Sequence, residues 1–170
     1  LSDFTGKLPV GISLTEFYDV LDLGLRTEAQ AAQASQGKRP SLQQQFCQLM
    51  SDWKVMPQHQ AMMRWARHFS CPVLTTNFEH TLSDAVQARA FICKETAFTD
   101  YYPWESYFST QELSDPCAGF GIWHINGMQK YHRSIRLGLT HYMGSVERAR
   151  ARLHKGSQRL SAGGDIRHWE

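Results

Sequence analysis

The feature that most constrains the fold is a change in hydrophobic period near residue 70. Before it, apolar residues recur at the three- and four-residue intervals of amphipathic helices. At 71–76 the sequence reads Cys-Pro-Val-Leu-Thr-Thr, which is short, rich in β-branched residues and has a proline near its start, as edge and initial strand positions allow. Strand and helix patterns then alternate. This order predicts an α/β fold with a helical N-terminal part and a mostly parallel sheet with flanking helices.

Three helices are expected before the change of period. Ser13 and Glu16 have the spacing of a capping box, in which each side chain accepts a hydrogen bond from the other's backbone, so a helix is expected from about residue 14 into the twenties. The turn-rich stretch 28–40 predicts a fraying helix end and an exposed loop. A second helix begins near Ser41, Pro57 interrupts it, and a third runs to about residue 69. The side chains expected to face inward from the second helix are Leu42, Phe46, Leu49, Met50 and Trp53.

Several further elements are expected after residue 76. Residues 91–93 and 134–138 are short strand candidates, and 119–127 alternates into a strand that ends in a turn. Residues 98–108 are dense in aromatic side chains, with a proline and acids among them, which predicts an irregular packed loop or lid. Residues 139–155 have the pattern of a helix. In α/β sheets ligands lie at the carboxyl ends of strands, so polar residues at those ends are the candidates for chemistry.

The composition is that of a single folded domain. The 170 residues are 42% hydrophobic and 20% charged, which is enough to bury a core without disulfides. The longest apolar runs span only a few residues and the start of the sequence has no signal-peptide pattern, so neither a membrane span nor secretion is expected. The four cysteines stand singly, with no C-x-x-C pair. They are expected to be reduced thiols in a cytoplasmic protein.

The charge is unevenly distributed along the chain. Residues 1–123 hold 9 Lys or Arg against 13 Asp or Glu, whereas residues 124–170 hold 9 against 3. Such a basic last third suits a polyanion or a phosphate-bearing ligand, and it is also what a solvated helical face looks like. Nucleic-acid binding through Arg148, Arg150, Arg152 and Lys155 rests on charge alone and is the least favoured of these interpretations.

The first candidate site follows the strand predicted at 71–76. Thr75, Thr76, Asn77 and Glu79 place two hydroxyls, an amide and a carboxylate where that strand emerges. An Asn amide donates one hydrogen bond and accepts another, so Asn77 can fix a ribose hydroxyl or a water without adding charge. The other interpretation of Asn77 is a turn former or helix cap. Glu79 stands in the first helical turn, where a carboxylate also suits the helix dipole.

The second candidate site is the segment Trp-His-Ile-Asn-Gly-Met at 123–128. In a strand, His124 and Asn126 point to the same face, so both are expected to reach one cleft. A histidine with a pKa near neutrality is a candidate general base, although a single histidine is also commonly a hydrogen-bonded structural residue. No metal is expected, because the histidines at 124, 132 and 141 are too irregularly spaced for a zinc site.

Three motifs, taken in order, resemble one protein family. Leu-Thr-Thr-Asn-Phe-Glu at 74–79, Ile-Trp-His-Ile-Asn-Gly at 122–127 and Ser-Ile-Arg-Leu-Gly-x-x-x-Tyr at 134–142 look like the sirtuin-like domain of bacterial NAD-consuming proteins, many of which are anti-phage defence effectors. The resemblance covers about residues 70–150 and implies a Rossmann-like sheet with NAD+ as substrate. It implies that Asn77 contacts the nicotinamide ribose and the catalytic water, with Glu79 near the same pocket. The residues it implies for NAD+ binding are Thr75, Thr76, Asn77, Phe78, Glu79 and Gly127.

The chain departs from the family pattern at three points. The family motif reads His-Gly with the histidine as general base, but Asn126 precedes Gly127 here and His124 lies two residues earlier. Either His124 has taken over the role, or catalysis relies on Asn126, or the site binds without turnover. The N-terminal Gly-rich phosphate loop is reduced to a trace at 10–13, so we expect residues 1–170 to be one sirtuin-like domain that is a fragment of a longer domain or chain. The four-cysteine zinc module of deacylating sirtuins is absent, which favours NAD+ hydrolysis.

The function expected from the resemblance is cleavage of the nicotinamide–ribose bond of NAD+ by a bacterial anti-phage defence effector. Asn77, His124 and Asn126 are the expected catalytic residues, with no metal. The alternative is a catalytically weak or inactive module that binds NAD+ or ADP-ribose and oligomerises. We expect a homo-oligomer or a partner protein, with Arg133 and Arg136 at an interface or the basic last third on the diphosphate of NAD+. Neither nucleic acid nor a membrane is an expected partner.

Overall fold

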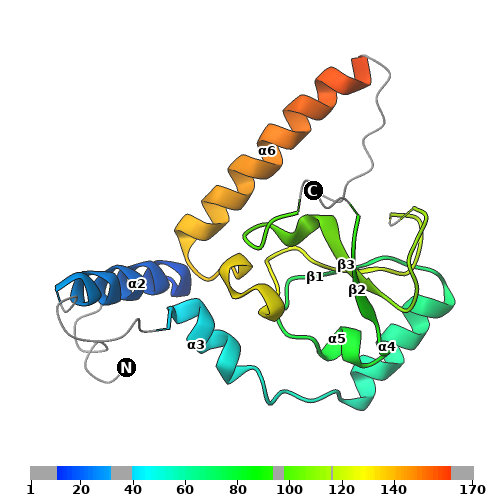
Figure 1. Ribbon diagram of the computed structural model, residues 1–170, viewed down its shortest axis with the longest axis horizontal. Helices are drawn as coiled ribbons and strands as arrows, with labels where there is room; N and C mark the ends of the chain where they lie inside the picture. The colour runs from blue at the N-terminus through cyan, green and yellow to red at the C-terminus, as the bar shows by residue number, and fades with distance from the viewer. Residues whose placement is uncertain (1–10, 32–39, 94–97, 116, 162–170) are drawn as a thin grey trace.

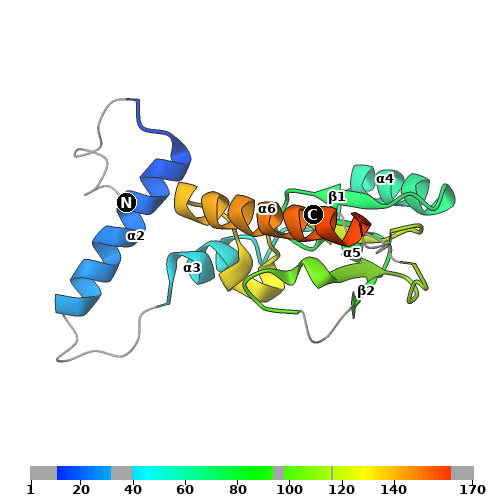
Figure 2. The same ribbon diagram turned by 90° about the horizontal axis from the view of Figure 1, so that it is seen from above.

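The computed structural model describes residues 11–31, 40–93, 98–115 and 117–161. A four-stranded sheet lies at the centre of the molecule, with α4 (Pro57–His68) and α5 (Thr81–Asp84) beside it (Figure 1). The long helix α6 (Leu139–Ser161) extends away from this body (Figure 1). On the opposite side from α4, α2 (Leu14–Ala31) packs on the start of α6, where Asp19 Oδ2 accepts the backbone N–H of Thr140 at 3.1 Å (Figure 2).

Helices form in the three regions expected before residue 70, and the capping box predicted at Ser13 and Glu16 is present. Ser13 N–H donates to Glu16 Oε2 at 3.0 Å and Glu16 N–H to Ser13 Oγ at 3.3 Å, so the capping box starts α2. Ser41 and Gln44 form a second capping box at the start of α3 (Leu42–Leu49). α4 begins at Pro57, which suits the first helical position because that position needs no N–H donor.

Two side chains expected to face inward from the second helix are exposed. Leu49 is 75% exposed and Trp53 is 60% exposed. For Trp53 the reason is that α3 ends at Leu49, so the helical spacing of apolar residues does not continue to Trp53. Cys47 and Met50 are the buried residues of this segment, and they form a small core cluster with Ile135.

The sheet mixes parallel and antiparallel pairs, which corrects the expectation of a mostly parallel sheet. The strands are β1 (Val73–Thr75), β2 (Arg89–Ile92), β3 (Ser106–Ser109) and β4 (Ile122–His124), and their order is β1-β4-β3-β2. Only β1 and β4 are parallel, whereas β2 pairs with β3 and β3 with β4 in antiparallel orientation. The described parts of the β2–β3 and β3–β4 connections contain no α-helix. Antiparallel neighbours need none, while a parallel pair requires a crossover.

The aromatic stretch 98–108, expected to be an irregular loop or lid, ends in a central strand. It holds the 3-10 helix η2 (Pro103–Glu105) and then β3, whose four residues are all buried. Because both faces of β3 are covered, its sequence shows no alternation of apolar and polar residues that would predict a strand.

The strand expected at 134–138 does not form. Ser134 ends the 3-10 helix η3 (Gln129–Ser134), and the residues after it pair with no strand. Their backbone groups are satisfied otherwise: the Ile135 carbonyl accepts from Gln43 Nε2 at 2.8 Å and Arg136 N–H donates to the Asn126 carbonyl at 3.0 Å. Hydrogen bonds with Gln43 and Asn126 have therefore replaced a ladder.

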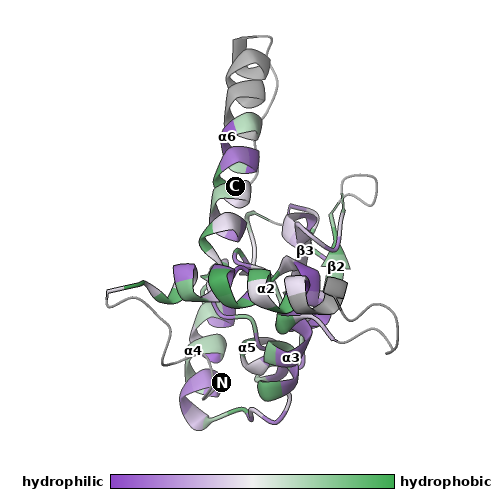
Figure 3. Ribbon diagram, turned by 90° about the vertical axis from the view of Figure 1, so that its left-hand side faces the viewer, coloured by the Kyte–Doolittle hydropathy of each residue, from purple (hydrophilic) through white to green (hydrophobic). Residues whose placement is uncertain are grey.

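The two faces of the sheet are covered differently. One face belongs to the larger core cluster, shared with α4 and α5. On the other face, rings from β2, β3 and β4 stack, with Tyr107 5.6 Å from Phe91 and 5.3 Å from Trp123 between ring centroids. Figure 3 shows hydrophobic and hydrophilic residues alternating along the described part of α6, which stands clear of these layers. The buried residues of the larger core cluster are Met63, Ala66, Leu82, Phe108, Phe120, Ile122 and Met128.

Candidate functional site

The two candidate motifs meet at the carboxyl ends of β1 and β4. These strands are parallel neighbours, and Thr75 is paired with His124 in their register. The backbone N–H of Ile125 donates to the Thr75 carbonyl at 3.0 Å, which continues the pairing to the ends of both strands. Residues about 50 positions apart are thus brought together at the sheet edge where α/β folds commonly bind ligands.

A direct contact joins two of the residues expected to be catalytic. His124 Nδ1 lies 2.7 Å from the backbone carbonyl of Asn77. Because a carbonyl only accepts, Nδ1 carries the proton, and Nε2 of the neutral ring is an acceptor. His124 is 2% exposed, and its Nε2 has no hydrogen-bond partner among the described residues. The site therefore holds a buried basic nitrogen in a fixed orientation.

Burial keeps this imidazole neutral. Loss of solvation lowers the pKa of His124 from 6.5 to about 4, and the neighbouring His80 acts in the same direction. The hydrogen bond to Asn77 and the charge of Glu79 oppose the shift. The His80 ring lies 6.0 Å from that of His124, and burial lowers the pKa of His80 as well. Two neutral imidazoles therefore lie side by side.

Glu79 organises the turn that follows β1. It is 5% exposed, and its Oε1 accepts Thr81 Oγ1 at 2.8 Å and the side-chain amide of Asn77 at 3.3 Å. The backbone N–H of Asn77 donates to Thr75 Oγ1 at 3.1 Å. Asn77 thus combines both interpretations made from the sequence: it forms the turn, and its exposed amide is held by a buried carboxylate.

The remaining residues of the first motif lie in different surroundings. Thr76 is exposed beside Asn77. Phe78 packs edge-on against Phe46, with ring centroids 6.0 Å apart, next to the small core cluster of Cys47. Thr76 and Asn77 are therefore accessible to a ligand, whereas Phe78 anchors the motif in the core.

Gly127 is required by the backbone. Its φ is +97°, and a Cβ at this position would lie 2.2 Å from the Ser134 carbonyl oxygen. Only glycine meets both conditions without distortion. The turn it makes lets the Asn126 carbonyl accept Arg136 N–H, so the end of β4 is tied to the segment that follows η3.

A cavity of about 300 Å³ lies between the sheet and the first half of α6. Aromatic and aliphatic side chains dominate its wall, and Asn126 adds an amide. Trp104, from the aromatic stretch expected to cover a pocket, also lines it and donates from Nε1 to the Ile125 carbonyl at 3.2 Å. The lining residues are Leu74, Trp104, Ser106, Trp123, His124, Ile125, Asn126, Tyr142, Ser145, Val146 and Ala149.

The His124 ring and the cavity lie toward different faces of the sheet. β4 ends at His124, so strand alternation does not extend to Asn126 and does not put the two side chains on one face. The His124 ring contacts His80 and Phe108, on the face that α5 covers. His124 borders the cavity at the strand end. Trp123, the preceding residue of β4, and Leu74, its partner on β1, point to the other face and form the wall.

Sequence reasoning missed two residues of this site. Thr81 and His80 follow Glu79 directly, and their adjacency to the motif was the available signal. Trp104 belongs to the aromatic stretch expected to cover a pocket, and η2 places it over the end of β4.

Neither a metal cluster nor a membrane helix is found in the described part of the chain. No group of three or more His, Cys, Asp or Glu side chains there is placed to hold a metal ion. None of the described helices is long and apolar enough to cross a membrane. Comparison with protein-family models, with curated proteins and with solved structures finds no match.

Proposed function

We propose that this chain is an NAD+ glycohydrolase that cleaves the nicotinamide–ribose bond. The observation that carries the proposal is the 2.7 Å contact between His124 Nδ1 and the Asn77 carbonyl at the ends of β1 and β4. It joins two of the three motifs on which the sirtuin-like resemblance rests. It also leaves a neutral imidazole with an unpartnered Nε2 within the described residues, as a general base requires.

The proposed chemistry needs few groups. The bond between the ribose C1′ and the ring nitrogen breaks, and its electron pair leaves with nicotinamide. The oxygen of a water molecule bonds to C1′, and the proton goes to Nε2 of His124. Because the transition state has oxocarbenium character, a weak base is sufficient and positioning dominates. The amide of Asn77, oriented by Glu79, would hold the ribose and the water.

The apolar cavity lies on the face of the sheet opposite the His124 ring, so it supplies a place for the planar ring in a module that binds without using that imidazole as a base. At about 300 Å³ it stands at the lower end of the volumes typical of ligand sites, about 300–1,000 Å³. That size suits the nicotinamide half of the substrate rather than the whole dinucleotide. Trp104 and Trp123 offer aromatic surface, and Asn126 offers one donor and one acceptor to a carboxamide.

A second candidate function is favoured by the burial of His124. Its ring is 2% exposed and turned toward α5, and Asn126 stands where the family has its histidine. Both observations support a module that binds NAD+ or ADP-ribose and oligomerises without turnover.

The cellular setting is also part of the proposal. An anti-phage defence role and assembly into oligomers follow from the resemblance alone. A cytoplasmic location agrees with the free thiols of Cys47, Cys71 and Cys93.

Nicotinamide release from NAD+ distinguishes the candidates. The purified chain should release nicotinamide, and Asn77→Ala and His124→Ala should lower the rate by about 100-fold or more. Arg64→Gln, an exposed change on α4, is the matched control and should not alter it.

The binding module makes the opposite prediction. The wild-type chain would then show thermal stabilisation by NAD+ or ADP-ribose without nicotinamide release, and Asn126→His would raise the rate. Absence of both release and stabilisation would contradict both candidates.

A further inference from the structure

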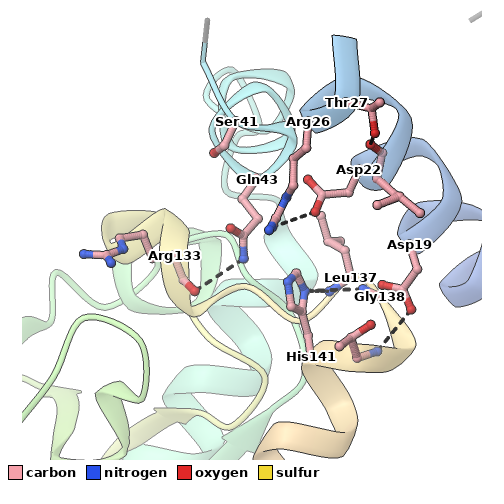
Figure 4. A network of polar contacts seen from close by, with 12 residues as sticks. Asp19, Asp22, Arg26, Thr27, Ser41, Gln43, Arg133, Leu137, Gly138 and His141 are labelled. Atoms are coloured by element: carbon pink, nitrogen blue, oxygen red, sulfur yellow. Dashed lines mark hydrogen bonds and ion pairs between the residues drawn. The ribbon is translucent and has the colours of Figure 1, made fainter. Parts of the chain in front are cut away.

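A second and larger cavity lies away from the sheet ends. It measures about 1,050 Å³ and opens between α2, the start of α3, residues 101–102, the end of η3 and the start of α6. Figure 4 shows Arg26 of α2 and Gln43 of α3 on one side of this space and His141 of α6 on the other. The charged side chains in its wall are Asp22, Arg26, Arg133 and Arg136.

Arg136 is a buried cation without a carboxylate partner. Its side chain is 5% exposed, it donates from Nη2 to the Tyr101 carbonyl, and its guanidinium carbon lies 4.6 Å from the centroid of the Tyr102 ring. It forms no ion pair with any described residue, and its Nε has no acceptor among them. A buried charge left in this state is costly, because no carboxylate of the described residues compensates it.

Arg148 adds a second cation at the same ring. Its guanidinium carbon lies 4.4 Å from the centroid of Tyr102, and it too forms no ion pair within the described residues. The two arginines repel each other, and together with burial this lowers the pKa of Arg136. The Tyr102 ring presents its π-face to both arginines, which reduces this repulsion without neutralising either charge.

The other cations at the cavity are only partly neutralised. Arg26 pairs with Asp22 at 2.7 Å, and Arg133 pairs with Asp100 at 3.2 Å while it covers the Tyr101 ring at 3.8 Å. Three arginines and one aspartate therefore line the wall.

The imidazole of His141 adds a hydrogen-bond donor to this wall. Its Nδ1 accepts backbone N–H groups of Leu137 and Gly138 at 3.3 and 3.4 Å (Figure 4). The proton of the neutral ring is consequently on Nε2, where it can be donated.

We infer that this cavity binds a phosphate-bearing anion, with Arg133 at its rim as the direct contact and Arg136 beneath as the uncompensated charge. Guanidinium groups fit phosphate oxygens in a forked, charge-assisted geometry. Among the charged side chains of the wall, the three arginines that donate hydrogen bonds outnumber the one aspartate that accepts them. The inference does not depend on NAD+ hydrolysis, because an anion can bind at these arginines whether or not the sheet-end site turns over a substrate.

The phosphate can come from two sources. The backbone hydrogen bond from Arg136 to Asn126 makes this cavity adjoin the smaller one, so the diphosphate of a dinucleotide is one source. A free phosphate or diphosphate ion is the other. Pyrophosphate and ADP-ribose are therefore both used as probes.

The first experiment measures pyrophosphate binding by the full chain, with sodium chloride at matched ionic strength as the reference. Pyrophosphate at about 100 times its dissociation constant should raise the Tm by about 5 °C over the reference. Arg133→Gln and Arg136→Gln should each weaken binding about 10-fold or more, as expected for loss of a charge-assisted hydrogen bond. Arg64→Gln removes an exposed arginine of α4 and should leave binding unchanged.

The outcomes distinguish the two phosphate sources and also test whether the cavity binds an anion at all. If the arginine variants weaken ADP-ribose and pyrophosphate equally, the cavity holds the diphosphate of the dinucleotide, and if they weaken pyrophosphate alone, it is a separate anion site. If Arg136→Gln does not fold, Arg133→Gln still decides, because its side chain is half exposed. A Tm shift no larger than that of sodium chloride, or equal weakening by Arg64→Gln, would overturn the inference.

Discussion

The two candidate regions handle buried polarity in opposite ways. At the sheet ends, Asn77, Glu79, Thr81 and His124 hydrogen-bond within one cluster that contains no arginine. At the larger cavity, Arg136 is buried with only a carbonyl and a π-face as partners. The first region is organised before any ligand arrives, whereas the second keeps an excess of positive charge that an anion would compensate. Preorganisation suits chemistry, and uncompensated charge suits recognition.

The largest effect on this comparison is expected from Gly127→Ala, because this turn joins the two regions. A methyl group there would lie 2.2 Å from the Ser134 carbonyl oxygen, at a φ of +97°. We expect a loss of more than about 3 kcal/mol in the free energy of unfolding, from backbone strain and overpacking together. Urea denaturation measures it.

The matched control is Gly11→Ala. Gly11 also has a positive φ, +91°, but no atom of the described residues lies within 4 Å of its Cβ position. It should cost about 1 kcal/mol, the price of the backbone conformation alone. Equal losses for the two variants would show that the Ser134 contact does not tie the regions together.

The next largest effect is a pH dependence that belongs mainly to the sheet-end region. Above pH 6.5 the His124 ring is neutral in both folded and unfolded chains. Below pH 6.5 the unfolded chain takes up a proton that the folded chain accepts only near its own pKa of about 4. The free energy of unfolding therefore decreases as the pH is lowered from 6.5 to about 4. The loss approaches about 3 kcal/mol, and the lowered pKa of His80 adds to it in the same direction.

Two histidine variants separate the regions in this experiment. Urea denaturation between pH 7.5 and 4.5 should show a shallower loss of stability in His124→Gln than in the wild-type chain. His141→Gln, at the larger cavity, should remove a smaller part, because burial lowers its pKa less strongly. An unchanged slope in His124→Gln would contradict the neutral, buried imidazole.

How far the sequence predicted these regions depends on how local their determinants are. The starts of α2 and α3 were predictable because a capping box is complete within four residues. The sheet-end motif was predictable because Thr75, Asn77 and Glu79 are adjacent in sequence and their hydrogen bonds stay within the motif.

The rest depends on contacts between distant residues. β3 escaped prediction because burial on both faces removes the alternation of apolar and polar residues. The antiparallel pairing of β2 with β3 and of β3 with β4 follows from connections whose described parts contain no α-helix. The basic last third indicated an anion, but the arginines of the larger cavity come from α2, from the end of η3 and from the segment around Arg136. Only the fold shows which of them is left without a counterion.

A smaller effect should come from Thr81→Val, which removes a donor to the buried Glu79 without changing the shape of the side chain. The lost hydrogen bond is charge-assisted and 2.8 Å long. We expect a loss of about 2 kcal/mol in unfolding free energy. Arg133→Gln, which breaks the half-exposed pair with Asp100, should cost less than about 1 kcal/mol. A larger loss for Arg133→Gln would reverse the contrast between the two regions.

The smallest effect should be the most diagnostic, because its sign is opposite. Arg136→Met replaces a buried, uncompensated cation by an apolar side chain of similar length, at the cost of one hydrogen bond to the Tyr101 carbonyl and the contact with Tyr102. Replacement of buried charges by apolar residues is often neutral or stabilising, so we expect a gain of about 1 kcal/mol without any anion present. Arg64→Met, on the exposed face of α4, should change stability by less than about 0.5 kcal/mol. With pyrophosphate added, the order of the wild-type chain and Arg136→Met should invert, because the wild-type chain binds the anion more tightly and gains more stability from it. A loss of stability in Arg136→Met that pyrophosphate does not alter would mean that the arginine serves the packing of Tyr102 and not an anion.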